Sequence, residues 1–284
     1  MKKLLSLLLT FGMICSLSSP AFASEQSSSY SLDNNPRADI YRSVVEDFSS
    51  MPQLYWTSGD SENNYGSHGL ITLMGISVAS VRNNAIDDYF TPTRSQWLIE
   101  YSVMPDIDER GTLNALFDCH FYGPNEKNYW GGTDTAYTRF KNHYNTAVIQ
   151  YRSGNYLVAT QELGRAIHFI SDINNPHHAN NADAVRYPSH TQFEDYVEEA
   201  RENNIVNPAN IPLSYLSAFS SKSLKTIANE SGAFARQYFS YANSMNGLVL
   251  DRSRAVLAIN PTYCNAQKVT AGVIYKFCDE VGMF

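Results

Sequence analysis

Two histidine–acid pairs with four-residue spacing constrain most strongly how this chain folds. His168 and Asp172 form the first pair, His190 and Glu194 form the second, and His178 lies between them. This spacing puts both side chains of a pair on one face of an α-helix. Imidazole nitrogens and carboxylate oxygens bind divalent metals. A surface hydrogen bond is the simpler interpretation of one such pair, but two pairs flanking a third histidine favour a hydrolytic metal centre.

The residues around these pairs carry helix start and stop signals. Apolar residues over 157–170 follow a helical period. The Asn-Asn-Pro run at 174–176 ends that helix, because proline cannot continue the hydrogen-bond ladder. Ser189, with Gln192 three residues later, predicts an N-cap with a capping box. His190 is then expected in the first turn of the second helix.

The remainder of the chain also indicates helices. We predict them over residues 39–48, 70–81, 95–103, 137–151, 217–230, 231–250 and 266–281, with loops at 104–108 and 206–214. Few segments alternate as strands do, and no internal repeat is present. Hydrophobic residues make up 43% of the 284, enough for a substantial core. The sequence therefore predicts an all-α fold in a single multi-helix domain.

The N-terminus indicates export. Two lysines, an apolar run and Ala21-Phe-Ala23 predict a signal peptide over 1–23. No later apolar stretch reaches 18 residues, so we expect a secreted protein without a transmembrane segment. Removal of the signal leaves Cys119, Cys264 and Cys278, which allow at most one disulfide. No Cys-x-x-Cys motif is present, so a finger-type structural zinc site is not expected.

Further motifs follow in order along the chain: Ser67-His68, Pro105-Asp106 with His120 fourteen residues later, and Lys268-Val-Thr-Ala-Gly272. With His168-x3-Asp172-x5-His178 and His190-x3-Glu194, they resemble the bacterial zinc-dependent phospholipase C family, including the catalytic domain of the alpha-toxin type. Fungal single-strand nucleases share the same three-zinc site. The resemblance covers Trp56 to the C-terminus, and it implies a catalytic domain over 56–284 that encloses a trinuclear zinc site.

The resemblance also implies the ligands of three Zn2+ ions per chain. Asp106, His120, His168 and Asp172 would hold the first ion, and His178, His190 and Glu194 the second. His68, the other side of Asp172, and the α-amino and carbonyl groups of Trp56 would hold the third. A free α-amino group, with a pKa of about 8, can lose its proton to a metal, whereas an amide nitrogen cannot readily do so. We therefore expect cleavage before Trp56, which makes residues 24–55 a propeptide.

Such a centre predicts phosphodiester hydrolysis. Zinc lowers the pKa of a bound water to about 7, and neighbouring metals can stabilise both the attacking and the leaving oxygen at phosphorus. Asp106 is the candidate catalytic residue, because it could orient or deprotonate the attacking water while binding metal; a role as ligand alone is equally open. Asp108 is the rival acid, but the fourteen-residue offset to His120 favours Asp106.

The charge of the chain bears on which phosphodiester is cleaved. The first 55 residues hold four of the 21 Lys and Arg and five of the 28 Asp and Glu, so the remainder is acidic. Broad affinity for nucleic acid rests on Lys and Arg contacts with phosphates. We therefore favour a phospholipase C acting on phosphatidylcholine-type lipids and expect no specific nucleic acid partner. The alternative is a single-strand nuclease or 3′-nucleotidase-like enzyme on the same site.

The resemblance implies a small headgroup pocket made of an acid and two aromatic residues. Phe117, three residues before His120, matches one aromatic position, so it is a candidate substrate contact. Ile107 stands where the family has tyrosine, and Asp60 and Glu62 lie near the position of the acid but not at it. A choline cation can bind between ring faces and a carboxylate. This departure leaves the headgroup specificity open.

Three further expectations concern partners and the remaining histidines. We expect a monomer that contacts membranes peripherally. Because the chain ends just after its last predicted helix, we expect it to lack the C-terminal lipid-binding domain of the alpha-toxin type and therefore to act weakly on intact membranes. A non-enzymatic alternative is a secreted metal-binding protein whose precursor is never processed. His143 and His177 match no family position, so we expect them on the surface or beside the ligands.

Overall fold

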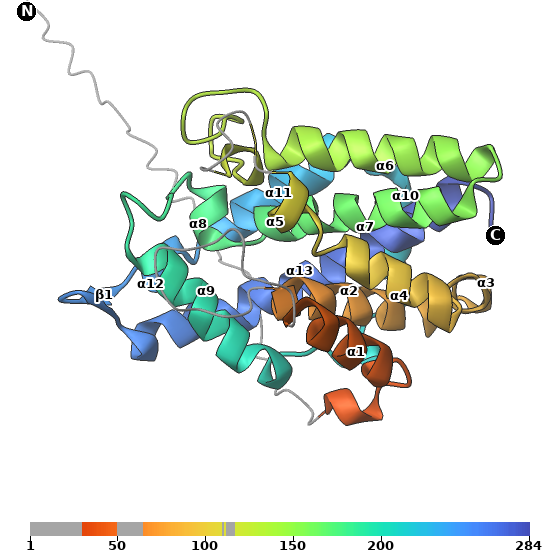
Figure 1. Cartoon of the computed structure of the whole chain (residues 1–284), viewed down its shortest axis with the longest axis horizontal. Coiled ribbons are helices and arrows are strands. Elements are labelled where there is room, and N and C mark those ends of the chain that lie inside the picture. Colours follow the sequence, from red (N-terminus) through yellow and green to blue (C-terminus); the bar gives the residue numbers. More distant parts are fainter. Residues whose placement is uncertain (1–29, 50–64, 110, 112–116) are drawn as a thin grey trace, which may run out of the picture.

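The computed structural model describes residues 30–49, 65–109, 111 and 117–284, and its regular structure is almost entirely helical (Figure 1). The α-helices are α1 Ala38–Ser49, α2 Tyr65–Ser80, α3 Asn84–Tyr89, α4 Pro92–Tyr101, α5 Pro105–Asp108, α6 Ala136–Arg152, α7 Tyr156–Ile173, α8 Pro176–Ala179, α9 Ser189–Ala200, α10 Leu213–Ser221, α11 Leu224–Arg236, α12 Phe239–Ala242 and α13 Arg252–Glu280. Four 3-10 turns, η1 Leu32–Asn34, η2 Asp118–His120, η3 Arg201–Asn203 and η4 Pro208–Asn210, and two short strands, β1 Met245–Asn246 and β2 Val249–Leu250, complete the described elements. The all-α prediction is confirmed.

The helices pack around three long ones, α2, α7 and α13. Helix α6 lies beside α7 along its length, α4 packs on α7 as well, and α13 crosses the molecule and contacts both α2 and α7 (Figure 1). Their buried apolar side chains form one continuous cluster. This arrangement holds the C-terminal end of α7, with His168 and Asp172, at the centre of the molecule.

Helix α2 is apolar on all sides, and its residues from Gly69 to Ser80 are buried. A helix of this kind is stable only when other elements surround it. Gly75 permits the contact with α13, because a Cβ atom there would lie 2.4 Å from Thr270 Cγ2. Thr270 and Gly272 belong to the Lys268–Gly272 motif, and Gly272 leaves room in the same way for the ring of Phe219. This motif therefore contributes helix packing.

The helix predicted over 231–250 is wrong in its second half. Helix α11 ends at Arg236, the single turn α12 follows, and β1 and β2 form an antiparallel hairpin in which Met245 pairs with Leu250. Gly247 has a φ angle of +67° at the first position of the two-residue turn. Glycine adopts such an angle without strain, and two-residue hairpin turns of the II′ type favour glycine at their first position. The turn therefore outweighs the apolar Leu248–Leu250 run.

Two local predictions next to the candidate ligands also need correction. Residues 105–108 form the single helical turn α5 instead of a loop, because Pro105 stands at the first helical position, where its missing N–H costs nothing. Ser189 is not an N-cap: helix α9 begins at Ser189 itself, and Pro188 precedes it without a side-chain cap. The Ser189 hydroxyl bonds to Asn243 Oδ1 instead.

The helix predicted over 217–230 is also wrong as a single element, because the chain breaks between α10, which ends at Ser221, and α11, which begins at Leu224. The short helix α3 was not predicted, and α13 begins well before residue 266. The remaining helix predictions agree with the structure to within about five residues at each end. The three cysteines of the described region, Cys119, Cys264 and Cys278, are free thiols. The predicted signal peptide 1–23, Trp56 and the two headgroup acids at 60 and 62 lie outside the described residues. Within the described ranges, no helix has both the length and the apolar composition needed to cross a bilayer.

Candidate metal centre

Eight of the nine predicted ligands lie in the described part of the chain, and the fold brings all eight together. They come from six elements: His68 from α2, Asp106 from α5, His120 from η2, His168 and Asp172 from α7, His178 from α8, and His190 and Glu194 from α9. The i,i+4 pairs share a helix face as predicted. The ninth, Trp56, is not described.

Four of these residues form the first candidate set: Asp106, His120, His168 and Asp172. His120 Nδ1 lies 2.9 Å from Asp172 Oδ2 and 3.0 Å from His168 Nε2, and the last two atoms are 3.2 Å apart. Asp106 Oδ1 lies 3.6 Å from His120 Nδ1 and 3.5 Å from His168 Nε2. Donor atoms about 2.0–2.1 Å from a tetrahedral zinc ion are roughly 3.3 Å from one another. The first set fits zinc.

His178, His190 and Glu194 form the second set. Glu194 Oε1 lies 3.0 Å from His178 Nε2 and 2.9 Å from His190 Nε2, and the two ring nitrogens are 3.1 Å apart. Three lone-pair groups facing one point repel one another unless a proton or a cation lies between them. This set has the donor types and spacing of a zinc site with an open fourth position.

His68 lies beside the first set. Its Nε2 is 3.7 Å from Asp172 Oδ1 and 3.9 Å from Asp106 Oδ2, so it faces the carboxylate oxygens that point away from His120 and His168. Asp172 therefore presents Oδ2 to the first set and Oδ1 to His68. Oδ1 also lies 3.1 Å from His178 Nδ1. Asp172 could therefore contribute an oxygen to each of two neighbouring candidate sites, and the His68 position has fewer described donors than the other two.

The far nitrogen of each of three histidines has a hydrogen-bond acceptor. His168 Nδ1 donates to Ser102 O at 2.9 Å, and His120 Nε2 donates to Glu109 O at 2.8 Å. His68 Nδ1 donates to Ser171 Oγ at 2.7 Å, whose own proton goes to His168 O. Each ring therefore directs its other nitrogen toward the centre, where it could bind a metal. Metal-binding histidines are typically oriented in this way.

Glu109 is the orienting residue that sequence reasoning missed. Its backbone carbonyl binds His120, while its carboxylate, 12% exposed, is held by three cationic side chains. These are Arg165 at 2.5 Å, Arg139 at 3.0 Å and His143 at 3.0 Å. Every residue has a backbone carbonyl, so no sequence motif could have identified this contact.

The charges in the site oppose one another in the absence of metal. Burial raises the pKa of Asp172, but His168, His178 and His120 lower it by more than burial raises it, so this pKa lies well below its usual value. Burial lowers the pKa of His178, yet Asp172 and Glu194 raise it to about 10. Burial and the neighbouring His168 lower the pKa of His68 to about 4. A divalent cation would replace the protons that now balance these carboxylates.

The candidate ligands differ in how far solvent reaches them: a buried group forms the floor of the site, and Asp106 lies at its solvent-facing mouth. The side chains of His120, His168, Asp172 and His190 are at most 3% exposed. Asp106 is 24% exposed and is the most accessible of the eight. Of the eight candidate ligands, Asp106 is thus the one most accessible to solvent. Asp108, the rival acid, instead pairs with Arg165 at 2.6 Å.

The other sequence candidates have clear positions. Phe117 is 5% exposed, with its ring centroid 5.4 Å from that of His120, and Ile107 packs against the core. His143 is bound between Glu109 and Glu162. His177 is fully buried, stacks on His190 with 5.1 Å between ring centroids, and contacts Ser189 Oγ at 3.1 Å. Neither histidine is exposed at the surface: His177 lies directly against His190, whereas His143 is connected to His120 only through Glu109.

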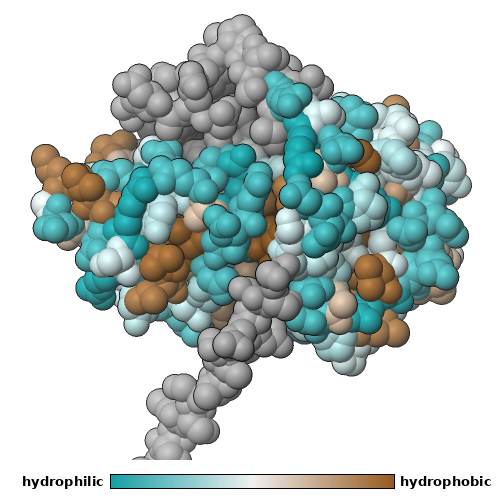
Figure 2. Space-filling model, turned by 90° about the horizontal axis from the view of Figure 1, so that it is seen from below, coloured by the Kyte–Doolittle hydropathy of each residue, from teal (hydrophilic) through white to brown (hydrophobic). Residues whose placement is uncertain are grey.

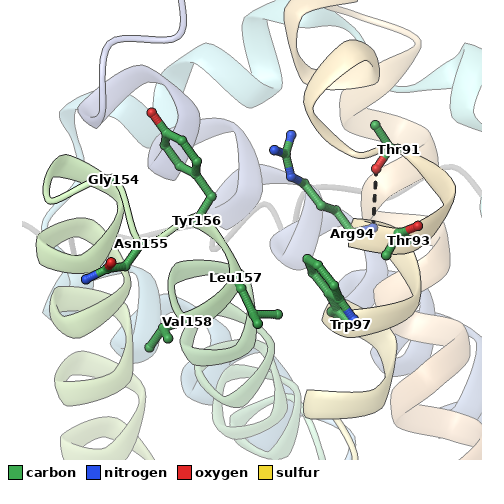
Figure 3. A pocket seen from close by; sticks show the side chains of 9 residues that line it. All are labelled: Thr91, Thr93, Arg94, Trp97, Gly154, Asn155, Tyr156, Leu157 and Val158. Atoms are coloured by element: carbon green, nitrogen blue, oxygen red, sulfur yellow. Dashed lines mark hydrogen bonds between the residues drawn. The ribbon is translucent and has the colours of Figure 1, made fainter.

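An open hollow of about 640 Å³ lies elsewhere, between the first turns of α4 and α7. Figure 3 shows Arg94 and Trp97 on one side of it and Tyr156 and Leu157 on the other. Tyr156 precedes His168 by twelve residues of one helix, roughly 18 Å at 1.5 Å per residue. This hollow holds no cluster of metal-ligating side chains and is separate from the candidate metal centre.

Comparisons with known proteins agree with this geometry. A family model described as zinc-dependent phospholipase C matches residues 76–245, a range that contains seven of the eight described ligands. The chain is 28% identical over 244 residues to a phospholipase C of Clostridium perfringens (strain 13 / Type A), covering 76% of this chain and 59% of that protein. It is 27% identical over 241 residues to a phospholipase C of Paraclostridium bifermentans, with the same 76% and 59% coverage.

The chain thus spans about three fifths of the length of these relatives. Among solved structures, alpha toxin from Clostridium absonum has a similar fold, with a TM-score of 0.67 and 23% identity over 79% of this chain and 66% of that one.

Proposed function

The chain belongs to the zinc-dependent phospholipase C family, and on this basis we propose that it is a secreted phospholipase C. Its substrates are phosphatidylcholine-type phospholipids, which it hydrolyses to diacylglycerol and a phosphorylated headgroup. The observation that carries the proposal is the convergence of eight donors from six elements, with spacings of 2.9–3.6 Å in the first set. We assign three zinc ions per chain, one to each set and one beside His68.

Bound zinc supplies Lewis acidity toward the phosphate oxygens and makes water acidic enough to attack phosphorus near neutral pH. The chain's own residues hold and orient the reactants. Buried His168 and Asp172 fix the floor of the site. Asp106, the most exposed candidate ligand, would help to hold the metal and would orient the attacking water, whose proton it could accept. Removal of the Asp106 carboxylate then lowers turnover even in protein that still contains zinc.

The third zinc requires a maturation step. Among the described residues, the carboxylates that face His68 Nε2 are those of Asp106 and Asp172, at 3.9 and 3.7 Å. The α-amino group of Trp56 would supply the missing nitrogen after cleavage of the Tyr55–Trp56 bond, so residues 24–55 are a propeptide in this proposal. N-terminal sequencing of active, secreted protein tests it: a chain that begins at Ser24 with full activity would contradict the maturation step.

Surface features support contact with a lipid surface. Three large apolar side chains are strongly exposed: Trp130 at 62%, Val185 at 82% and Leu248 at 86%. Trp130 and Val185 lie within ten residues of a candidate ligand in the chain, and Leu248 lies beside α9 through a contact with Gln192. Trp130 connects to the site through Tyr129 and Phe121, and Phe121 stacks on His178 with 4.7 Å between ring centroids. Hydrophobic surface is visible at the left edge of Figure 2, where the β1–β2 hairpin projects in Figure 1.

Gln192 fixes the position of that hairpin relative to the site. Its side chain binds Leu248 O at 3.1 Å and Leu250 N at 2.7 Å, from the same helix that carries Glu194. Exposed apolar residues next to a catalytic site suit an enzyme whose substrate lies in a membrane. Phe117, against the ring of His120, is the proposed wall of the headgroup pocket.

The proposal is tested by metal analysis together with a paired substrate assay. Purified protein is expected to contain zinc and to hydrolyse water-soluble phosphatidylcholine faster than single-stranded RNA, and chelation should abolish both activities. Glu194→Gln should lose zinc and activity. Glu199→Gln, on the exposed side of the same helix and paired with Arg252, is the matched control and should retain both.

Faster cleavage of RNA would favour the nuclease alternative. Zinc bound without hydrolysis of either substrate would favour a metal-binding protein. Full lipid hydrolysis in the presence of a chelator would overturn the proposal.

A further inference from the structure

The N-terminal segment, residues 30–49, is part of the packed body although it belongs to the predicted propeptide. Leu32, Asn35, Ala38 and Tyr41 recur every three residues and are 1–4% exposed. Such spacing gives η1 and α1 one buried face, and α1 packs on α2 and α4 (Figure 1). Leu32, Ala38 and Tyr41 belong to the same continuous core cluster as the buried side chains of the helices after Trp56.

Polar groups fix this segment at defined positions. Asn35 Nδ2 donates to Ser77 Oγ at 2.8 Å in a buried contact. Arg37, 14% exposed, donates to Ser95 Oγ at 3.1 Å, to Phe90 O at 3.0 Å and to Asp87 at 3.0 Å. A nearly buried guanidinium with this set of partners is specific, because loss of the arginine removes a charged donor from Ser95 Oγ, Phe90 O and Asp87 together.

Tyr41 connects the segment to the start of α2. Its hydroxyl donates to Gly66 O at 3.0 Å and accepts from Arg201 Nε at 2.9 Å. Its ring lies so close to Gly69 that a Cβ there would be 3.3 Å away. His68 lies between these two glycines. The segment therefore contacts α2 on both sides of the candidate ligand.

Helix α9 holds the same turn of α2 from the other direction. Glu198 accepts from Ser67 N at 3.0 Å and forms an ion pair with Arg201. Tyr263 OH donates to Ser67 O at 3.0 Å. Tyr41, Arg201 at the start of η3 and Glu198 of α9 thus form one largely buried hydrogen-bonded group that joins these elements to α2 beside His68.

We propose that residues 30–49 stay bound to the body of the enzyme after the chain is cut before Trp56, so that the processed enzyme is a complex of two fragments. None of the contacts above depends on the peptide link between residue 49 and Trp56. Departure of the segment would expose the apolar surface under Leu32, Ala38 and Tyr41 and leave Gly66 O without its tyrosine donor. The proposal rests on the maturation step of the proposed function, but an engineered cut tests it separately.

The experiment replaces residues 50–55 with a protease recognition sequence and cleaves the purified, zinc-loaded protein in vitro. Size-exclusion chromatography at micromolar concentration, followed by mass spectrometry under native and denaturing conditions, reports whether the N-terminal peptide elutes with the body. We expect co-elution, with release only in denaturant. A peptide that elutes separately overturns the proposal, whether or not the remaining body keeps its helical circular dichroism signal.

Two matched arginine variants distinguish specific binding from nonspecific adhesion. Arg37→Ala should weaken retention of the peptide by on the order of tenfold, because hydrogen bonds from a charged, buried group are lost. Arg42→Ala removes an exposed arginine of the same segment, 44% exposed and paired with Asp33, and should leave retention unchanged. Equal retention in both variants would contradict the assigned contacts.

N-terminal sequencing of natural secreted protein reports on maturation alone. A natural chain that begins upstream of Trp56 would refute the maturation step, while co-elution after the engineered cut would still support the assigned binding of the segment.

Discussion

Removal of the negative charge of Glu109 tests whether a residue outside the donor sets controls zinc binding. Its carboxylate faces Arg165, Arg139 and His143, and its backbone carbonyl holds His120. Burial raises the pKa of Glu109, but His143 and Arg165 lower it by more than burial raises it, from 4.5 to about 2. That shift corresponds to at most about 3 kcal/mol at neutral pH. The contribution is present above pH 4.5 and is lost as the pH falls toward 2.

Glu109→Gln should therefore destabilise the metal-free protein by roughly 2 kcal/mol at pH 7, since three cations lose a partner that is only partly replaced by solvent. Displacement of the 109 carbonyl loosens the ring of His120, and loss of such an orienting contact typically lowers metal affinity by about 10- to 100-fold. Glu162→Gln is the control, because Glu162 contacts His143 but not Glu109. It should cost less than about 1 kcal/mol and leave zinc affinity unchanged.

Urea unfolding of the metal-free variants and chelator competition for zinc measure the two effects independently. If Glu109→Gln lowers stability but both variants bind zinc as tightly as the original protein, Glu109 supports the fold only, and the orienting role is refuted.

Four other predictions concern pH, metal, packing and lipid. Burial lowers the pKa of His143, but Glu109 and Glu162 outweigh it and raise this pKa to about 9. The contribution of His143 to stability is therefore complete below about pH 6.5 and is lost as the pH rises through 9. The difference in Tm between the original protein and His143→Gln should shrink over that range, and a constant difference would contradict this. Zinc binding at pH 7 should release protons, because ligand imidazoles must be neutral; a calorimetric enthalpy that does not change between buffers of different ionisation enthalpy would argue against it. Gly75→Ala should lower the free energy of unfolding by about 1–3 kcal/mol, because the new Cβ would lie 2.4 Å from Thr270 Cγ2. Adding Thr270→Ser, which removes that methyl group, should restore part of the loss in urea unfolding. Additive effects of the two substitutions would contradict this explanation. Leu248→Ser should slow hydrolysis of phosphatidylcholine vesicles but not of a soluble short-chain substrate. The control Leu257→Ser, at a leucine of α13 that is 55% exposed, should affect neither reaction. Equal slowing by both variants would exclude a specific role for the hairpin.

Local geometry explains which parts of the site were accessible from the sequence. His168 with Asp172, and His190 with Glu194, are joined by one helical turn each, so their spacing alone predicted that each pair shares a face. The convergence of His68 on Asp172 depends on how α2 packs against α7 and α13, and no local pattern encodes that. The resemblance to a family supplied this part of the prediction.

Where sequence reasoning failed, tertiary or backbone effects decided. The Leu248–Leu250 run satisfied a helical pattern, but Gly247 at positive φ formed a hairpin. The Ser189 hydroxyl was expected at a cap, yet a tertiary bond to Asn243 engages it. Residues 39–48 were recognised as amphipathic, but only the structure shows that Tyr41 reaches the start of α2.

The central claim is that histidines and acids distant in the sequence converge to hold zinc for hydrolysis of a phosphodiester. Anomalous diffraction at the zinc absorption edge, from crystals of the processed protein, tests it most directly. The account predicts one peak among Asp106, His120, His168 and Asp172, a second among His178, His190 and Glu194, and a third beside His68. Crystals grown with zinc that show no peak at the first two positions, or peaks only elsewhere, would contradict it.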